Sequence, residues 1–376
     1  MSLSSRSFLV VAGESSGDAH AAELIRHLRG SLSDYSLFGL GGDKLIAQGL
    51  QPLFHVSDMQ VTGFVEVAKR YSFFRNVLRR TVAEVRTQNP AFAILVDYPG
   101  FNLRLARFLH EVDIPVYYYI APQMWAWREG RVRFLRRFVK KLIVLFPFEQ
   151  IFFSKRGVST EYYGHPLGNR LEAGREKRLE AAKKIIGNDR RRIIAYLPGS
   201  RQNEVKPHLE ELKGLARQLG DGYRHIIARA GSLSLEFIER GFSDEGLFEV
   251  VDSSEGLLEA ADVGIIKSGT STLQTAMIGT PFVVIYKASP ITYLLGRSLA
   301  KVKHISIVNI LADKLVVPEL IQGDLTAENL WMSINDILFN EDRKEEMIGH
   351  FREIMESLRG DDPYRDAANS IIESLA

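Results

Sequence analysis

The chain has 376 residues and a formal net charge of +2, and a balance so close to zero argues against a nucleic-acid-binding protein. Hydrophobic residues make up 45% and charged residues 25%, which is typical of a folded globular chain of two or three domains. The chain has no cysteine, which excludes a disulfide framework, a Cys-ligated zinc site and a thiol nucleophile. It has neither a long apolar segment nor the regions of a signal peptide, so we expect a cytoplasmic protein.

Short apolar runs alternate with helical stretches along the whole chain. The first set of runs covers 8–12, 37–40, 92–96, 116–120 and 142–146, and the second covers 193–197, 225–228, 248–251, 263–266, 282–286 and 305–308. Most runs are unbroken rather than alternating, which is typical of strands buried on both faces of a parallel sheet. Repeated strand–helix units predict an α/β fold with right-handed crossovers.

A charged, helical stretch at 171–192 separates the two sets of runs. The simplest architecture is two Rossmann-like, doubly wound domains that face each other across a cleft. We therefore expect domains at 1–170 and 171–345, followed by a charged helical segment at 346–376. This last segment is expected either to pack on the first domain or to be exchanged between subunits.

The first candidate site follows the run at 8–12, where Gly13 and Glu14 lead into a helix. A Gly/Ser turn before a helix places backbone N–H groups where an anion or polar ligand binds. Glu14 is therefore a candidate ligand or base. The alternative, that the polar residues of this turn only cap the helix, stays open.

The second candidate is Asp97, which closes the apolar run at 92–96. An acid in that position lies at the carboxyl edge of the sheet, and partial burial there raises its pKa into the range that suits a general base. The alternative is an Asx turn before Pro99 and Gly100.

Two further turns follow strands of the second set and resemble phosphate sites. In the first turn, Ser200 offers a hydroxyl and Arg201 a planar guanidinium that fits phosphate oxygens. The second turn opens a helix with glycine and small hydroxyl residues, a pattern that cradles phosphate. Together these turns give the candidate binding residues Ser200, Glu204, Ser268, Gly269, Thr270, Ser271 and Gln274.

Two basic stretches have different interpretations. Between 69 and 80 there are five cations and no acid, with Tyr71, Phe73, Phe74, Arg75 and Arg79 as the core of a candidate membrane patch. The alternative is a helix packed inside the first domain, since Phe74 begins an apolar stripe. The second stretch, 128–141, has seven cations and one acid, and we expect an ordinary solvated helix face there.

Taken together, the motifs resemble those of the lipid-A-disaccharide synthases, which are bacterial inverting glycosyltransferases. The motifs in order are VAGESSGD, VDYPGFN, APQMWAWREGRV, LFPFEQ, GHPL, LPGSRQNEV, SGTSTLQTAMIGTPFVVIYK and ISIVNIL, and they span nearly the whole chain. The resemblance implies two domains of the GT-B type, no metal and no cofactor, and attachment to the inner membrane from the cytoplasmic side. It also implies a UDP-2,3-diacylglucosamine donor and a 2,3-diacylglucosamine 1-phosphate acceptor, and it allows a homodimer.

The resemblance implies that Asp97, Arg201 and Asn309 are critical for activity, with Asp97 or Glu14 as the base. Two residues depart from the family pattern, since Gly100 replaces a frequent second Asp and Gln274 stands where many UDP-sugar enzymes have Glu. The alternative enzyme is another UDP-sugar enzyme of the same fold, such as a UDP-N-acetylglucosamine 2-epimerase or a peptidoglycan-type transferase. A catalytically silent, membrane-associated binding protein is the alternative from another class.

Overall fold

The computed structural model describes residues 6–59, 67–126, 129–242, 246–289, 293 and 302–375. The chain divides into two compact units, one formed by 1–166 with 360–376 and the other by 167–359. The second division falls after helix α18 (Glu341–Ser357), whereas the sequence suggested a boundary at 345. Among the described residues, none of the helices combines the length and apolar character needed to cross a membrane.

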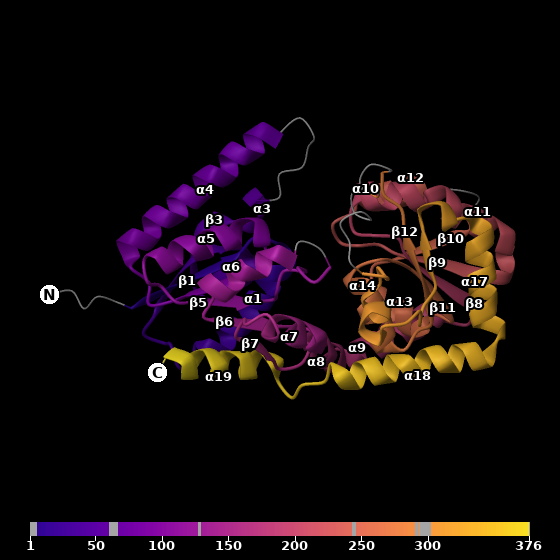
Figure 1. Ribbon diagram of the computed structural model, residues 1–376. Helices are drawn as coiled ribbons and strands as arrows, with labels where there is room; N and C mark the ends of the chain where they lie inside the picture. The colour runs from indigo at the N-terminus through magenta and orange to yellow at the C-terminus, as the bar shows by residue number, and fades with distance from the viewer. Residues whose placement is uncertain are drawn as a thin grey trace. The chain divides into compact units, whose positions relative to one another are not determined.

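Unit 1 is built on a seven-stranded parallel sheet with the order β3-β2-β1-β4-β5-β6-β7 (Figure 1). Its strands are β1 (Ser7–Ala12), β2 (Ser36–Gly41), β3 (Leu50–His55), β4 (Ala93–Val96), β5 (Val116–Tyr119), β6 (Lys141–Val144) and β7 (Thr160–Tyr162). The central strand β1 is buried along its whole length, as the unbroken apolar run predicts. A sheet buried on both faces needs helices on both sides.

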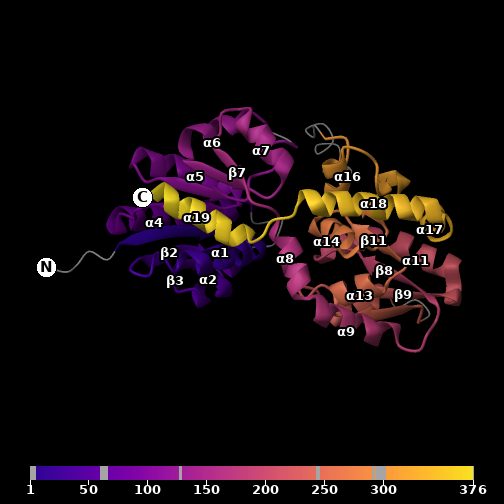
Figure 2. The same cartoon turned by 90° about the horizontal axis from the view of Figure 1, so that it is seen from below.

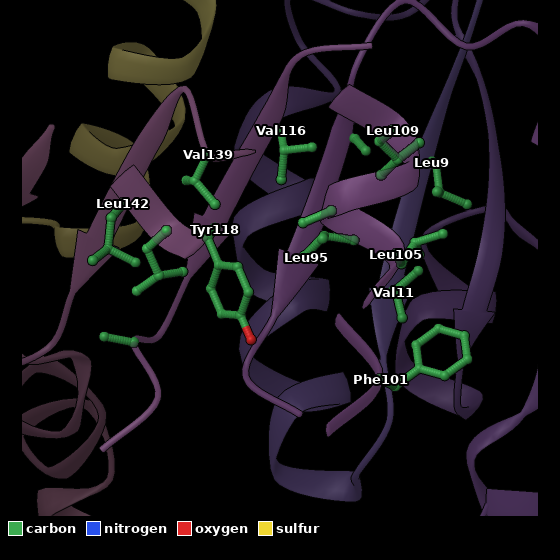
Figure 3. Packing of buried hydrophobic residues seen from close by; sticks show 14 of the residues in the cluster. Leu9, Val11, Leu95, Phe101, Leu105, Leu109, Val116, Tyr118, Val139 and Leu142 are labelled. Carbon is green, nitrogen blue, oxygen red and sulfur yellow. The ribbon is translucent and has the colours of Figure 1, made fainter. Parts of the chain in front are cut away.

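The helices of unit 1 cover the two faces of its sheet in two separate apolar clusters. They are α1 (Ser15–Leu28), α2 (Asp43–Ala47), α3 (Val56–Met59), α4 (Val67–Gln88), α5 (Pro99–Glu111), α6 (Val132–Phe138), α7 (Pro147–Ser154) and α19 (Pro363–Leu375). Helices α4, α5 and α6 pack on one face, and Figure 3 shows part of this cluster with the ring of Tyr118 among the apolar side chains. Helices α1 and α19 pack on the other face.

Unit 2 contains a six-stranded parallel sheet with the order β10-β9-β8-β11-β12-β13. Its strands are β8 (Arg192–Leu197), β9 (Tyr223–Ala228), β10 (Phe248–Val251), β11 (Val263–Lys267), β12 (Phe282–Tyr286) and β13 (Glu319–Ile321). Its helices include α9 (Arg175–Ile186), α10 (Gln202–Val205), α11 (Leu209–Leu219), α12 (Leu235–Gly241), α13 (Ser254–Ala260), α14 (Thr270–Ile278), α16 (Ile307–Ala312), α17 (Ala327–Phe339) and α18, while α8 (Pro166–Ala173) begins at the unit boundary. The predicted fold class, with two doubly wound α/β domains, is confirmed.

One predicted strand is wrong, because the segment 305–308 enters helix α16 instead. Ser306 caps this helix by accepting a hydrogen bond from the backbone N–H of Val308. The carboxylate of Glu319 accepts the N–H groups of Ile305 and Ser306, which fixes the approach to the helix. Capping of this kind competes with strand pairing for an apolar run.

Candidate functional site

The first part of the candidate site is the switch point of the unit 1 sheet, where the strand order reverses between β1 and β4. Ala12 pairs with Val96 at the carboxyl ends of these strands. Glu14 follows one strand and Asp97 follows the other, so the two predicted acids leave the sheet at the same edge. Ligands of doubly wound sheets bind in the crevice outside this edge.

Asp97 has an unusual backbone, which neighbouring side chains hold in place. Its φ is +45° and that of Tyr98 is +48°, both in the left-handed region that side chains other than glycine rarely adopt. The carbonyl oxygen of Asp97 accepts hydrogen bonds from the Asn102 amide (2.7 Å) and the Tyr118 hydroxyl. Strained backbone that is held from several sides in this way is typical of functional sites.

Gly13 allows the loops after β1 and β4 to pack closely. A Cβ atom at Gly13 would lie 2.3 Å from the ring of Tyr98, so any side chain there would displace the ring. The first glycine of the VAGESSGD motif is therefore required for steric reasons, because a side chain at this position would collide with the loop that carries Asp97. Asp18 of the same motif is also structural, because its carboxylate accepts the N–H groups of Gly42 (2.6 Å) and Leu45.

The surroundings of Asp97 raise its pKa to about 6, chiefly through burial and then through the negative charge of Glu14. A carboxylate with such a pKa is ionised at neutral pH and is still basic enough to accept a proton. Glu14 itself is exposed and stands at the N-cap position, directly before α1. The geometry brings the two predicted acids into one electrostatic environment.

Glu149 is a third acid at this edge, which our sequence analysis did not single out. Its side chain is 3% exposed and accepts a hydrogen bond from the Trp125 indole (2.9 Å) and two backbone N–H groups. Burial raises its pKa to about 7 against these hydrogen bonds, and the charge of Asp97 adds to the rise. The sequence feature that could have identified Glu149 is the LFPFEQ motif, in which this acid follows strand β6. Trp127, the second tryptophan of its motif, lies outside the described residues.

The second part of the candidate site is a cavity of about 440 Å³ at the switch point of unit 2, between β8 and β11. It is lined by residues of the loops that follow β8, β9, β10 and β11. Seven of the predicted site residues lie in this lining, namely Ser200, Arg201, Glu204, Ser268, Gly269, Thr270 and Ser271. The structure therefore brings together two turns that are about 70 residues apart in the sequence.

The turn after β8 is organised around Glu204. Its carboxylate accepts a hydrogen bond from the Ser200 N–H (3.0 Å) and lies 3.4 Å from the Lys267 ammonium. Although burial opposes it, these contacts and the charge of Arg201 lower the pKa of Glu204. Gly199 has a φ of +136°, and a Cβ there would lie 2.9 Å from the Cβ of Glu204. Glu204 therefore shapes the turn as well as lining the cavity.

Arg201 is the most accessible cation of the cavity. Its side chain is 72% exposed, and its ion pair with Glu204 is long at 3.9 Å. The guanidinium can therefore turn to an incoming anion at little cost. The cavity has two further cations that the sequence analysis did not select, Lys267 and Arg229. Arg229 is held by Asp252, with an N–O distance of 2.6 Å.

The N-terminal end of α14 lines the same cavity through Thr270 and Ser271, together with Ser268 and Gly269, which directly precede the helix. The hydroxyl of Ser268 donates to the carbonyl of Ile305 (3.1 Å), so it is committed to the fold. The N-terminal N–H groups of a helix and its dipole both favour an anion at this position. Together with the three cations, this helix end makes the cavity suitable for a phosphate group.

Two predicted binding residues do not line the cavity. The Gln274 amide donates to Glu255 (2.8 Å), which also pairs with Arg170. Asn309 is fully buried and holds the segment after α16, because its amide bonds Val317 and Glu319. Neither side chain is part of the cavity lining. The contacts of Asn309 hold the fold together, and its expected importance for activity stays a prediction.

The candidate membrane patch on α4 is divided between core and surface. Phe73 and Phe74 are half-buried and pack against the apolar cluster under α4, with a ring distance of 6.3 Å from Phe74 to Tyr98. Arg75 and Arg79 are exposed, and the side chain of Tyr71 lies outside the described residues. Both phenylalanine rings are therefore partly committed to the core of unit 1, and contact of this patch with a membrane stays a prediction.

Within the described residues, no group of three or more His, Asp or Glu side chains is arranged to hold a metal ion. A model of the lipid-A-disaccharide synthetase family matches residues 8–368. The lipid-A-disaccharide synthase of Myxococcus xanthus is 35% identical over 98% of this chain and 97% of its own length. The corresponding enzyme of Syntrophus aciditrophicus is 36% identical over 93% and 94%.

Solved structures with the same fold are far more distant in sequence. The UDP-GlcNAc 2-epimerase of Neisseria meningitidis superposes with a TM-score of 0.63 at 12% identity, covering 98% of this chain and 99% of its own. MurG of Acinetobacter baumannii superposes with a TM-score of 0.59 at 11% identity, with the same coverage. At such identities the likeness supports the fold and leaves the reaction to the residues of the site.

Proposed function

The chain belongs to the lipid-A-disaccharide synthase family, and we propose that it joins UDP-2,3-diacylglucosamine to 2,3-diacylglucosamine 1-phosphate. The products are the β-1,6-linked disaccharide 1-phosphate and UDP. The main structural support for this proposal is the cationic cavity at the switch point of unit 2. Its positive groups would stabilise the negative charge that develops on the departing UDP.

In the proposed reaction, the 6-hydroxyl of the acceptor attacks the anomeric carbon of the donor. The new C–O bond forms as the bond to the UDP oxygen breaks, and the electron pair of that bond leaves with UDP. The hydroxyl proton passes to the carboxylate of Asp97. Attack from the face opposite to UDP inverts the anomeric carbon and gives the β linkage.

The residues of unit 2 stabilise the leaving group in this proposal. Arg201 and the N-terminus of α14 bind the diphosphate, and Lys267 adds a third positive group. Arg229 adds a further cation to the lining, and Ser200 adds a neutral hydroxyl. Interactions with charge that develops in the transition state contribute directly to rate.

Asp97 is the proposed base, and Glu14 tunes it. The pKa of Asp97, raised to about 6, supports this assignment. Glu14 is more exposed and carries the charge that contributes to the rise. The proposal assigns Glu149 the task of holding Trp125, and with it the loop after β5, beside this centre.

Both proposed substrates carry acyl chains, so we propose that the enzyme works at the cytoplasmic surface of the inner membrane. The exposed cations Arg75 and Arg79 on α4 support contact with anionic lipid there. Replacing both by Glu should weaken sedimentation with anionic vesicles, while Phe73→Ser should lower the melting temperature because that ring packs in the core. Unchanged sedimentation of the Arg variant would remove α4 from the contact.

The decisive experiment is incubation of the purified chain with both diacylated sugars, followed by mass spectrometry of the lipid product and measurement of released UDP. We expect a tetraacyl disaccharide monophosphate in equal amount to UDP. A parallel sample with UDP-N-acetylglucosamine alone tests the epimerase alternative by NMR. Epimerised sugar without any disaccharide would reject the proposed function.

A further inference from the structure

Besides the cavity of unit 2, the molecule has a hollow of about 740 Å³ in unit 1, between helices α5 and α6. Its lining comes from the last turns of α5, with Arg107, His110 and Glu111, and from α6, with Arg133, Phe134, Arg136, Arg137 and Phe138. Asp97 precedes the first turn of α5, so the hollow lies at the opposite end of that helix. It is therefore separate from the candidate catalytic centre.

The hollow combines aromatic rings with guanidinium groups. The rings of Phe134 and Phe138 lie 5.9 Å apart, and the ring of His110 lies 5.3 Å from Phe138. The guanidinium of Arg133 lies 5.4 Å from the Phe134 ring, and that of Arg137 lies 5.5 Å from the Phe138 ring. These contacts orient the cations without neutralising them.

The positive charge of the hollow is largely uncompensated. Among the described residues of its lining, the one carboxylate is Glu111, which pairs with Arg107 at 3.0 Å. Arg133, Arg136 and Arg137 are exposed, and none of them forms an ion pair with any residue that the structure describes. Arg156 nearby differs in this respect, because Glu129 neutralises it. A cluster of three such arginines favours an anionic partner.

The same chemistry continues onto the next helix of this face. On α4, the guanidinium of Arg86 lies 5.4 Å from the ring of Phe108 on α5, and Arg75 and Arg79 are exposed. Helices α4, α5 and α6 cover the same face of the sheet (Figure 1), whereas α1 and α19 lie on the other (Figure 2). The cations are therefore distributed over one side of unit 1.

We propose that the hollow between α5 and α6 receives phosphate head groups of an anionic phospholipid bilayer, with Arg133 and Arg137 as their ligands. Guanidinium groups bind phosphate oxygens in pairs, and amphipathic clusters of Phe and Arg are suited to the depth of lipid head groups. A free anion would gain nothing from contact with the aromatic rings, and a nucleic acid would need a longer row of cations. The proposal rests on the proposed function only in that the acyl-chain substrates require a membrane surface.

The absence of cysteine from the chain allows a direct test by a single label. Arg137→Cys carries an environment-sensitive fluorophore into the hollow, and Arg352→Cys carries it onto an exposed position of α18 in unit 2. On vesicles that contain phosphatidylglycerol we expect a blue shift at 137 and none at 352. Neutral phosphatidylcholine vesicles should produce no shift at either position. Vesicle binding without a shift at 137 would overturn the proposal.

The second measurement compares two pairs of neutralised arginines. Arg133→Gln with Arg137→Gln should weaken binding to the anionic vesicles about 25-fold, at about fivefold for each cation near the lipid. The matched pair, Arg175→Gln with Arg352→Gln on unit 2, should bind as the unchanged chain does. Equal weakening by both pairs would show a general charge effect and overturn the site.

The activity assay separates this proposal from the proposed function. With detergent-dispersed sugars, the Arg133→Gln/Arg137→Gln variant should keep its turnover, and its melting temperature should be unchanged because both side chains are exposed. A fall in that turnover with vesicle binding kept would assign the hollow to the reaction and overturn the lipid proposal. Absence of turnover in the unchanged chain would reject the proposed function and leave the vesicle result standing.

Discussion

The switch points of the two sheets occupy equivalent places and differ in charge. Both sheets run outward from a first strand that pairs with the second and fourth strands of its unit, so the crevice lies between β1 and β4 in one unit and between β8 and β11 in the other. The edge of unit 1 carries Glu14, Asp97 and the buried Glu149. The edge of unit 2 carries Arg201, Arg229 and Lys267.

Sheet topology therefore determines where a ligand binds, whereas the loops determine which chemistry is done there. In unit 1 burial and like charges keep an acid basic, which suits proton acceptance. In unit 2 three cations, of which only Arg201 is exposed, and a helix N-terminus suit a departing anion. If this division holds, loss of the proposed base in unit 1 should have the largest effect on turnover.

Asp97→Asn should reduce turnover about a thousandfold, since general-base catalysis contributes in the range of 10²–10⁴. UDP affinity, measured by calorimetry, should be unchanged because the proposed nucleotide site lies wholly in unit 2. Loss of UDP binding with an intact fold would make Asp97 a nucleotide ligand. Glu14 would then be the next candidate for the base.

The melting temperature of the Asp97→Asn variant at different pH values provides a control. The folded-state pKa of Asp97 is about 6, above the ordinary value of 3.8. A raised pKa means that the stabilisation from this group is complete below pH 4 and is lost as the pH rises through 6. Asp97→Asn should therefore melt at a higher temperature than the unchanged chain at pH 8, and the gain should disappear near pH 4.

Arg201→Ala tests the cationic half of the comparison. Losing a charge-assisted contact with the departing diphosphate should cost about 3 kcal/mol, or roughly a hundredfold in turnover. The melting temperature should not change, because the side chain is exposed and its ion pair is long. Arg240→Ala, at another exposed arginine of unit 2, is the matched control. Equal turnover of the two variants would show that Arg201 does not stabilise the departing diphosphate.

Glu14→Gln should change the pH profile more than the maximal rate. The charge of Glu14 contributes to the raised pKa of Asp97, so its removal should lower that pKa. A base with a lower pKa stays deprotonated in more acidic solution. The acid limb of kcat/KM, expected near pH 6 in the unchanged chain, should therefore move to lower pH. A profile that stays in place while the rate falls about a hundredfold would make Glu14 the base.

Most strands of the two sheets could be predicted from the sequence, because buried parallel strands have unbroken apolar runs. The runs at 8–12 and 263–266 correspond to the central strands β1 and β11. The missed strands β3, β7 and β13 all lie at sheet edges. Edge strands are less buried, so they lack the continuous apolar pattern on which the prediction depends.

The site was predictable as far as it lies in short loops that follow strands. Glu149 and Arg229 were missed because their importance arises from partners that only folding brings near, Trp125 for one and Asp252 for the other. The structural contacts of Asn309 were not predictable for the same reason, since its amide bonds backbone groups of a later segment. A motif identifies a loop, whereas the direction of each side chain depends on its neighbours in space.

Gln274 should have the smallest effect, and it defines where the site of unit 2 ends. Its amide donates to Glu255 at 2.8 Å, and it is not part of the cavity lining. Gln274→Ala should therefore leave UDP affinity within about threefold and cost about 1 kcal/mol of stability for the lost hydrogen bond. Gln274→Glu should be less stable than the unchanged chain at neutral pH, because it would set two carboxylates against each other. A tenfold or greater loss of UDP affinity in Gln274→Ala, at unchanged melting temperature, would extend the nucleotide site from the first turn of α14 to this residue.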